Sequence, residues 1–192
     1  MPASSCFELS QEAKTCLLEM VWQVLDEALR GNGLQLPPEP DYKELLEPAA
    51  SFVTLQHHGK LRGCIGSLQT NEPLWLNVCK NAYSSGFQDS RFPPLTPNDR
   101  AGLNVDISVL SDLVPIKNHG EATLLAALRP GIDGLLLEDE WHRAVFLPSV
   151  WEVLPTSEQF VRALKRKGGW PETYWNEDIV LHRFTTAVIS DA

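Results

Sequence analysis

The chain is organised around one stretch, Lys60-Leu61-Arg62-Gly63-Cys64-Ile65-Gly66-Ser67. It follows a strand-like segment, residues 51–57, and a turn at His58-Gly59, so residues 51–67 are predicted to form a β-hairpin. Glycines on both sides of Cys64 give the backbone a freedom that a cysteine used only as core filling does not need. We therefore expect the thiol to face open space at a functional site.

The register of this hairpin follows from its turn. A two-residue turn at 58–59 pairs Val53 with Cys64 and Leu55 with Arg62. Alternation then puts Arg62 on the same face as Cys64, where an adjacent positive charge favours the thiolate over the thiol. The buried face is expected to carry the apolar side chains of Leu61, Ile65 and Phe52.

The remaining site residues are predicted from two other segments. Residues 103–109 alternate cleanly, and their polar face carries Asp106, a candidate acid or base, and Ser108, a candidate ligand-binding group. The proline-rich loop 88–95 supplies Asp89 as a second catalytic candidate and Arg91 as a ligand-binding one. His57 is excluded as a base for Cys64, because the predicted register separates the two by ~13 Å.

Structural roles for the same residues stay open. A cysteine between glycines also suits a strand on which another element packs closely, and free cysteine is among the most buried residue types. Arg62 can serve only in a salt bridge, and Asp89 with Arg91 can simply hold their loop together. The histidines have no spacing typical of a shared metal site, so we expect no metal and no cofactor.

Composition narrows the classes of function. The chain has 192 residues, is 43% hydrophobic and has a formal net charge of -9, which disfavours general nucleic-acid binding and attraction to anionic membranes. Its four cysteines form no Cys-x-x-Cys pair, which is typical of reduced cytosolic thiols. No signal peptide and no membrane span are expected, so the protein is predicted to be cytoplasmic.

Periodicity predicts an α+β fold, and the length suits a single domain over residues 1–192 with a larger and a smaller lobe. A mainly antiparallel sheet is expected, flanked by helices, with a cleft between the lobes. The helices are expected near residues 10–30, 41–46, 73–83, 121–128 and 157–167. The strands are expected at residues 51–57, 60–67, 103–109, 134–137, 141–147 and 179–184.

The central stretch also carries a family resemblance. Leu61-Arg62-Gly63-Cys64-Ile65-Gly66 resembles the six-residue signature of the AMMECR domain family. The similarity extends over nearly the whole chain in matching order and spacing, through residues 51–55, 89–95, 107–111, 133–135 and 146–151. Two positions depart from the family pattern: Ser90 replaces a proline, and Ser84-Ser85-Gly86 replaces an alanine-rich helix end. Both departures are expected to loosen that loop slightly.

The resemblance implies a two-lobed α+β fold and a prokaryotic cytosolic protein. It also implies partners, a Memo-like protein and a radical-SAM protein, but no reaction. A glycine-rich signature around a thiol suits a backbone that faces a ligand, with Gly63 and Gly66 lining its site.

Two functions follow from these observations. The first is an enzyme or enzyme subunit that uses Cys64 to modify a nucleotide, RNA or protein group, with Arg62 holding an anionic group. The second is a non-catalytic binding or adaptor module whose groove receives a protein partner or a small anionic ligand.

Overall fold

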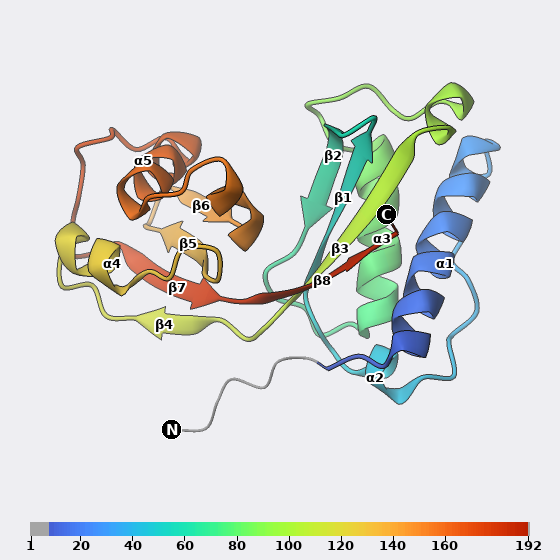
Figure 1. Ribbon diagram of the computed structural model, residues 1–192, viewed down its shortest axis with the longest axis horizontal. Coiled ribbons are helices and arrows are strands. Elements are labelled where there is room, and N and C mark those ends of the chain that lie inside the picture. Colours follow the sequence, from blue (N-terminus) through green and yellow to red (C-terminus); the bar gives the residue numbers. More distant parts are fainter. Residues whose placement is uncertain (1–7, 192) are drawn as a thin grey trace. The chain divides into compact units, whose positions relative to one another are not determined.

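The computed structural model describes residues 8–191, which divide into two compact units (Figure 1). The first unit takes the described residues up to Ser111 and resumes at Ala187, and the second unit is Asp112–Thr186. All the predicted site residues belong to the first unit. Cys6 lies outside the described residues.

The first unit is a four-stranded sheet with helices on one face. The strand order is β2-β1-β3-β8, and β1 pairs antiparallel with both β2 and β3. Its helices are α1 (Gln11–Leu29), α2 (Lys43–Leu46), α3 (Leu74–Phe87) and the short 3-10 helix η1 (Pro97–Arg100). Its strands are β1 (Ser51–His57), β2 (Lys60–Gly66), β3 (Leu103–Leu110) and β8 (Thr186–Ser190).

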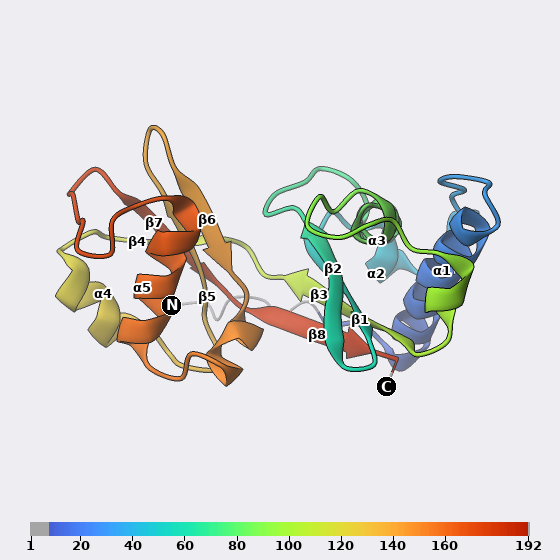
Figure 2. The same ribbon diagram turned by 90° about the horizontal axis from the view of Figure 1, so that it is seen from above.

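The core of this unit lies between the sheet and the pair α1 and α3, which lie on one side of β1 and β2 (Figure 2). Helix α1 begins where expected, because the Ser10 hydroxyl accepts the backbone N–H of Ala13 at 3.2 Å. Alternate residues of β1, Val53 and Leu55, are fully buried against the helices. The intervening residue, Thr54, therefore lies on the opposite face of the sheet, away from α1 and α3.

The second unit repeats this plan at smaller size. Its strand order is β4-β7-β5-β6, and its pairings β4–β7, β5–β7 and β5–β6 are antiparallel. Helices α4 and α5 cover the face that carries Leu135, Leu137 and Leu181. The elements are β4 (Val114–Ile116), α4 (Glu121–Ala127), β5 (Gly134–Glu138), β6 (Arg143–Phe146), the 3-10 helix η2 (Pro148–Glu152), α5 (Ser157–Gly168) and β7 (Val180–Phe184).

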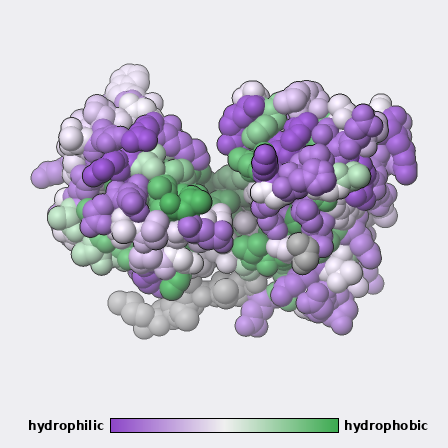
Figure 3. Space-filling model, turned by 45° about the horizontal axis from the view of Figure 1, so that its top comes forward, coloured by the Kyte–Doolittle hydropathy of each residue, from purple (hydrophilic) through white to green (hydrophobic). Residues whose placement is uncertain are grey.

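The α+β class with antiparallel strands is confirmed, with two corrections. Two four-stranded sheets are present where one was expected, and strands β4 and β8 were not predicted. The surface in Figure 3 is mostly hydrophilic, with small hydrophobic areas on each unit. Among residues 8–191, no helix combines the length and apolar character required to cross a bilayer.

Candidate functional site

A row of three side chains crosses the open face of the first sheet. Thr54 is the register partner of Cys64 in β2 and of Asp106 in β3, and directly opposed residues point to the same face. Thr54 Oγ1 lies 3.2 Å from Cys64 Sγ, within hydrogen-bonding distance. Cys64, Thr54 and Asp106 are all half-buried, so the row is open to solvent.

Asp106 ends this row in a polar cluster. Its carboxylate accepts a hydrogen bond from Gln56 Nε2 at 3.2 Å and another from the Ser190 hydroxyl of β8. Two strand spacings, roughly 10 Å, separate the Cα atoms of Asp106 and Cys64, so a proton can pass between them only through Thr54 or a bound molecule. Ser108, the other residue predicted on this face, is the register partner of Phe52 and is buried.

The row exists because the hairpin contains a β-bulge. Leu55 pairs with Gly63 but Gln56 pairs with Leu61, so Arg62 is the extra residue. The predicted pairing of Val53 with Cys64 is therefore wrong by one position, and a one-residue slip moves side chains to the opposite face.

Two further expectations fail for the same reason. Leu61 is 47% exposed, although it was expected to be buried. Phe52 lies on the face that carries the thiol, opposite Gly66, and was expected on the core face.

An ion pair from the proline-rich loop holds the backbone of Cys64. The Asp89 carboxylate accepts the Cys64 N–H at 3.0 Å, and the Arg91 guanidinium donates to the Cys64 carbonyl at 3.1 Å. Arg91 also donates to Asp89 through Nε at 3.0 Å and through Nη2 at 2.7 Å. The loop therefore bonds to both backbone groups of Cys64 along the outer edge of β2.

The chemistry of Asp89 follows from these bonds. The Arg91 guanidinium hydrogen-bonded to Asp89 holds the pKa of this carboxyl well below its usual range. Burial opposes this effect, and the backbone N–H groups of Cys64 and Arg91 lower the pKa further. The pairing with Asp89 also raises the pKa of Arg91. The Asp89 carboxylate is thus ionised and hydrogen-bonded to Arg91 and to the Cys64 N–H. These bonds hold the backbone of Cys64 in position.

Arg62 is hydrogen-bonded to the same loop. Its guanidinium donates to the carbonyls of Pro93 at 2.8 Å and Pro94 at 3.3 Å, and it lies 3.4 Å from Asp99. As the bulge residue it does not extend the Cys64 row. The cation bonded to the Cys64 backbone is Arg91.

Gly63 and Gly66 leave space that neighbouring parts of the protein occupy. A Cβ on Gly63 would lie 2.0 Å from the carbonyl oxygen of Ser85 in α3, and one on Gly66 would lie 2.3 Å from the Phe52 ring. The glycines let α3 and Phe52 approach β2, and the space beside both is already filled. The glycines therefore do not supply the open space that was expected at the thiol.

Ser85 also corrects the expectation that its segment is loose. Its hydroxyl is fully buried, accepts the N–H of Ile65 at 2.8 Å and donates to the carbonyl of Val53 at 2.7 Å. One side chain of α3 thus joins paired residues of β1 and β2, and this fixes the strand on which Cys64 lies.

The structure therefore brings Cys64, Asp106 and Ser108 to one sheet face, and Asp89 and Arg91 to one edge. Sequence reasoning missed Thr54, Gln56 and Ser190. The alternation of residues 51–57 signals the first two, because their polar side chains alternate with those of buried Val53 and Leu55. Within residues 8–191, no cluster of three or more His, Cys, Asp or Glu side chains has the arrangement of a metal site.

The comparisons agree with this architecture. The AMMECR1 family model matches residues 18–189, and the chain belongs to the AMMECR1 family. A protein of Methanothermobacter thermautotrophicus is 30% identical over 191 residues, which cover 95% of this chain and 96% of the relative. One of Thermotoga maritima is 34% identical over 166 residues, 85% of this chain and 90% of the relative.

A solved structure supports the fold directly. The crystal structure of the uncharacterized protein PH0010 from Pyrococcus horikoshii matches with a TM-score of 0.85 and 28% sequence identity. The match covers 94% of this chain and 92% of that one. None of these names gives a reaction, so the function must be argued from the site.

Proposed function

We propose that the protein is an enzyme or enzyme subunit in which the Cys64 thiol is the reacting group. The observation that carries this proposal is the 3.2 Å contact between Cys64 Sγ and Thr54 Oγ1, in register with the carboxylate of Asp106. A hydroxyl at this distance can orient the thiol or bond to its thiolate, and the thiolate is the nucleophilic form of cysteine.

The neighbouring residues have distinct tasks in this proposal. Asp89 and Arg91 fix the backbone on which the thiol is carried, and Thr54 sets the direction of the Sγ atom. Asp106 exchanges protons with the bound substrate, held in place by Gln56 and Ser190. The substrate is a nucleotide, RNA or protein group, and Memo-like and radical-SAM proteins act with this chain in the cytoplasm.

Alkylation by iodoacetamide tests the role of the thiol. Peptide-resolved mass spectrometry gives a separate alkylation rate for each cysteine. The rates are measured across about pH 5–10, roughly the range over which thiols titrate. Cys79 is an internal reference, because burial raises the pKa of its thiol to about 12. We expect Cys64 to react much faster than Cys79 and expect Thr54→Val to change its pH profile.

A Cys64 as unreactive as Cys79, or a profile unchanged by Thr54→Val, would remove the basis for a reacting thiol. Thr15→Val is the matched control, since the Thr15 hydroxyl donates to the Gln11 carbonyl on the exposed side of α1.

A binding or adaptor module is the second candidate, and one observation favours it. The charged groups Arg62, Asp89 and Arg91 are all bonded within the protein, which leaves the row and the adjacent Gln56 side chain to make contacts. Purified Memo-like protein from the same genome is the probe. If Gln56→Ala weakens its binding while Cys64→Ser does not, a partner surface explains the row better than chemistry at the thiol.

A further inference from the structure

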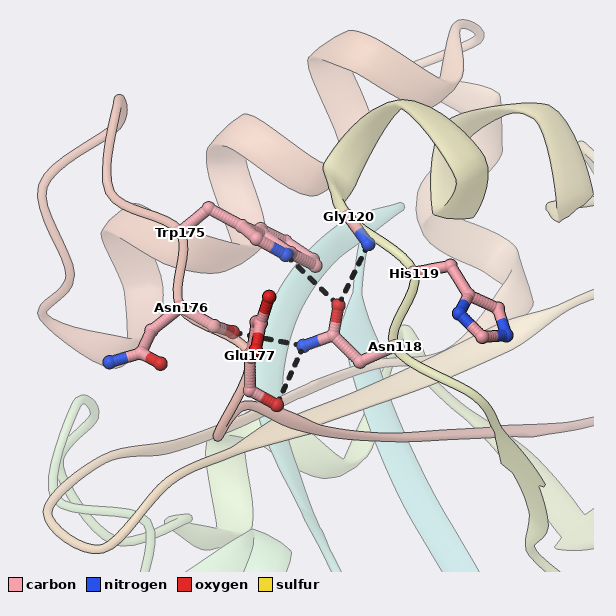
Figure 4. Close-up of a pocket in the computed structure, with 6 residues that line it drawn as sticks. All are labelled: Asn118, His119, Gly120, Trp175, Asn176 and Glu177. Carbon is pink, nitrogen blue, oxygen red and sulfur yellow. Dashed lines mark hydrogen bonds between the residues drawn. The ribbon is translucent and has the colours of Figure 1, made fainter.

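The second unit contains a pocket of about 640 Å³ that no part of the proposed function uses. Two segments form it, the chain just before α4 and the loop between α5 and β7 (Figure 4). Its lining residues are Asn118, His119, Gly120, Trp175, Asn176 and Glu177.

Asn118 fixes the wall of this pocket. Its amide nitrogen donates to the carbonyls of Asn176 at 2.9 Å and Ile179 at 3.0 Å. Its amide oxygen accepts the indole N–H of Trp175 at 3.0 Å and the backbone N–H of Gly120 at 3.1 Å. One side chain thus joins both segments and holds Trp175 in place, so the pocket is formed before any ligand arrives.

The charge in the pocket is negative. The Glu177 side chain extends toward the Trp175 ring, while the His119 ring lies on the other side of Asn118 (Figure 4). Within the described part of the chain, the Glu177 carboxylate has no hydrogen-bond or ion-pair partner. The neighbouring Lys117 is exposed and does not line the pocket.

A lysine close to the Trp175 ring already has a charge partner. Lys165 is buried, with its Nζ atom 5.8 Å from the centre of the Trp175 ring. That ammonium is paired with Glu121 at 2.7 Å and also donates to the Tyr174 carbonyl at 3.3 Å. The Lys165–Glu121 pair therefore adds no net charge beside the pocket, and Glu177 sets its sign.

We propose that this pocket binds an organic cation, an ammonium or guanidinium group on an apolar stem. The Glu177 carboxylate balances the charge, and the Trp175 ring contacts the stem and the cation. The carbonyl of Glu177, which accepts a hydrogen bond from the Asn118 amide at 3.4 Å, keeps a lone pair for an N–H donor. The site is independent of Cys64 and of the proposed function.

Titration with n-butylammonium chloride tests this proposal, with sodium butyrate as the control of equal length and opposite charge. The readout is the indole N–H signal of Trp175 in a ¹⁵N-labelled sample, assigned by its loss in Trp175→Phe. Butylammonium is expected to shift this signal saturably, with a dissociation constant on the order of millimolar. Butyrate is expected to leave it unmoved.

Two variants that each remove one negative charge distinguish binding at this pocket from a general effect of the protein's charge. Glu177→Gln is expected to weaken butylammonium binding about fivefold or more, while Asp178→Asn, one residue away and outside the pocket lining, changes it less than about twofold. Both side chains are exposed, so the fold should persist in each variant. Equal weakening by both variants, or no saturable shift in the unaltered protein, would overturn the proposal.

Discussion

The carbonyl oxygen of Ser85 lies 2.0 Å from the position that a Cβ on Gly63 would occupy. No side chain fits there without moving the backbone of α3 away from β2. The approach of this helix to the strand beside Cys64 therefore depends on a missing side chain.

Gly63→Ala is expected to lower the free energy of unfolding by about 3 kcal/mol or more, since the clash is with backbone and cannot relax by a change of rotamer. Urea denaturation followed by circular dichroism measures the loss. Cys64→Ser, at the next position and on the open face, should cost less than about 1 kcal/mol. A Gly63→Ala protein within that smaller range would show that α3 is not tightly packed on β2.

Ser85→Ala removes the hydroxyl that joins Val53 and Ile65. Two buried backbone groups lose a partner, so we expect a loss of about 1–3 kcal/mol in the free energy of unfolding. Ser84→Ala provides a matched control, because the Ser84 hydroxyl donates to the side chain of Gln88 at the exposed surface. Equal costs for the two variants would contradict the bridging role of Ser85.

Asp89→Asn tests the ion pair at Cys64. The folded-state pKa of Asp89 lies below the unfolded value of about 3.9, so its contribution is complete above that pH and is lost as pH falls through the folded-state pKa. The variant should be about 1.5–3 kcal/mol less stable at pH 7 and should lose less stability on acidification.

Urea unfolding at several pH values from about 2.5 to 7 measures both effects. Glu140→Gln, which removes one exposed negative charge in the second unit, is the control for a change in net charge alone. If the curves for Asp89→Asn and the unaltered protein stay parallel at all pH values, the pKa of Asp89 is not depressed in the folded state.

A similar prediction concerns the pKa of Asp139, which lies at the tip of the β5–β6 hairpin. Burial alone would raise its pKa, but hydrogen bonds from the Trp170 indole, the Trp141 N–H and His142 lower it to about 2. Its stabilisation is present above about pH 4 and is lost as pH falls through about 2. The carboxyl ¹³C shift followed by NMR should titrate at that lower value, and a midpoint near the model-peptide value of about 3.9 would refute the hydrogen-bonded arrangement.

The long periodic elements could be predicted from sequence alone. The helix after Ser10 and the alternating strand ending at Val109 both have patterns that local physics fixes. Strand β4 could not be found, because it has only three residues and contains Pro115. The separation into two sheets depends on which strands pair, and local periodicity carries no information about that.

The candidate site was predicted in part. Alternation put Asp106 and Ser108 on one face. The same strict alternation, applied through the hairpin, overlooked the bulge at Arg62, which the adjacent Gly63 could have signalled, so the position of Cys64 relative to Thr54 was missed. The Asn118 pocket was also missed, because its two segments are distant in sequence. Only the folded chain brings Trp175 and Gly120 together.

Strand β2 is the last strand of its sheet, and no strand among residues 8–191 pairs along its outer side. Such an edge normally invites a strand from another molecule, since its N–H and C=O groups are available for pairing. At Cys64 both groups are already bonded to Asp89 and Arg91. The ion pair thus blocks strand addition at the position of the thiol, and protects the protein from edge-to-edge aggregation where its most reactive side chain is expected to be.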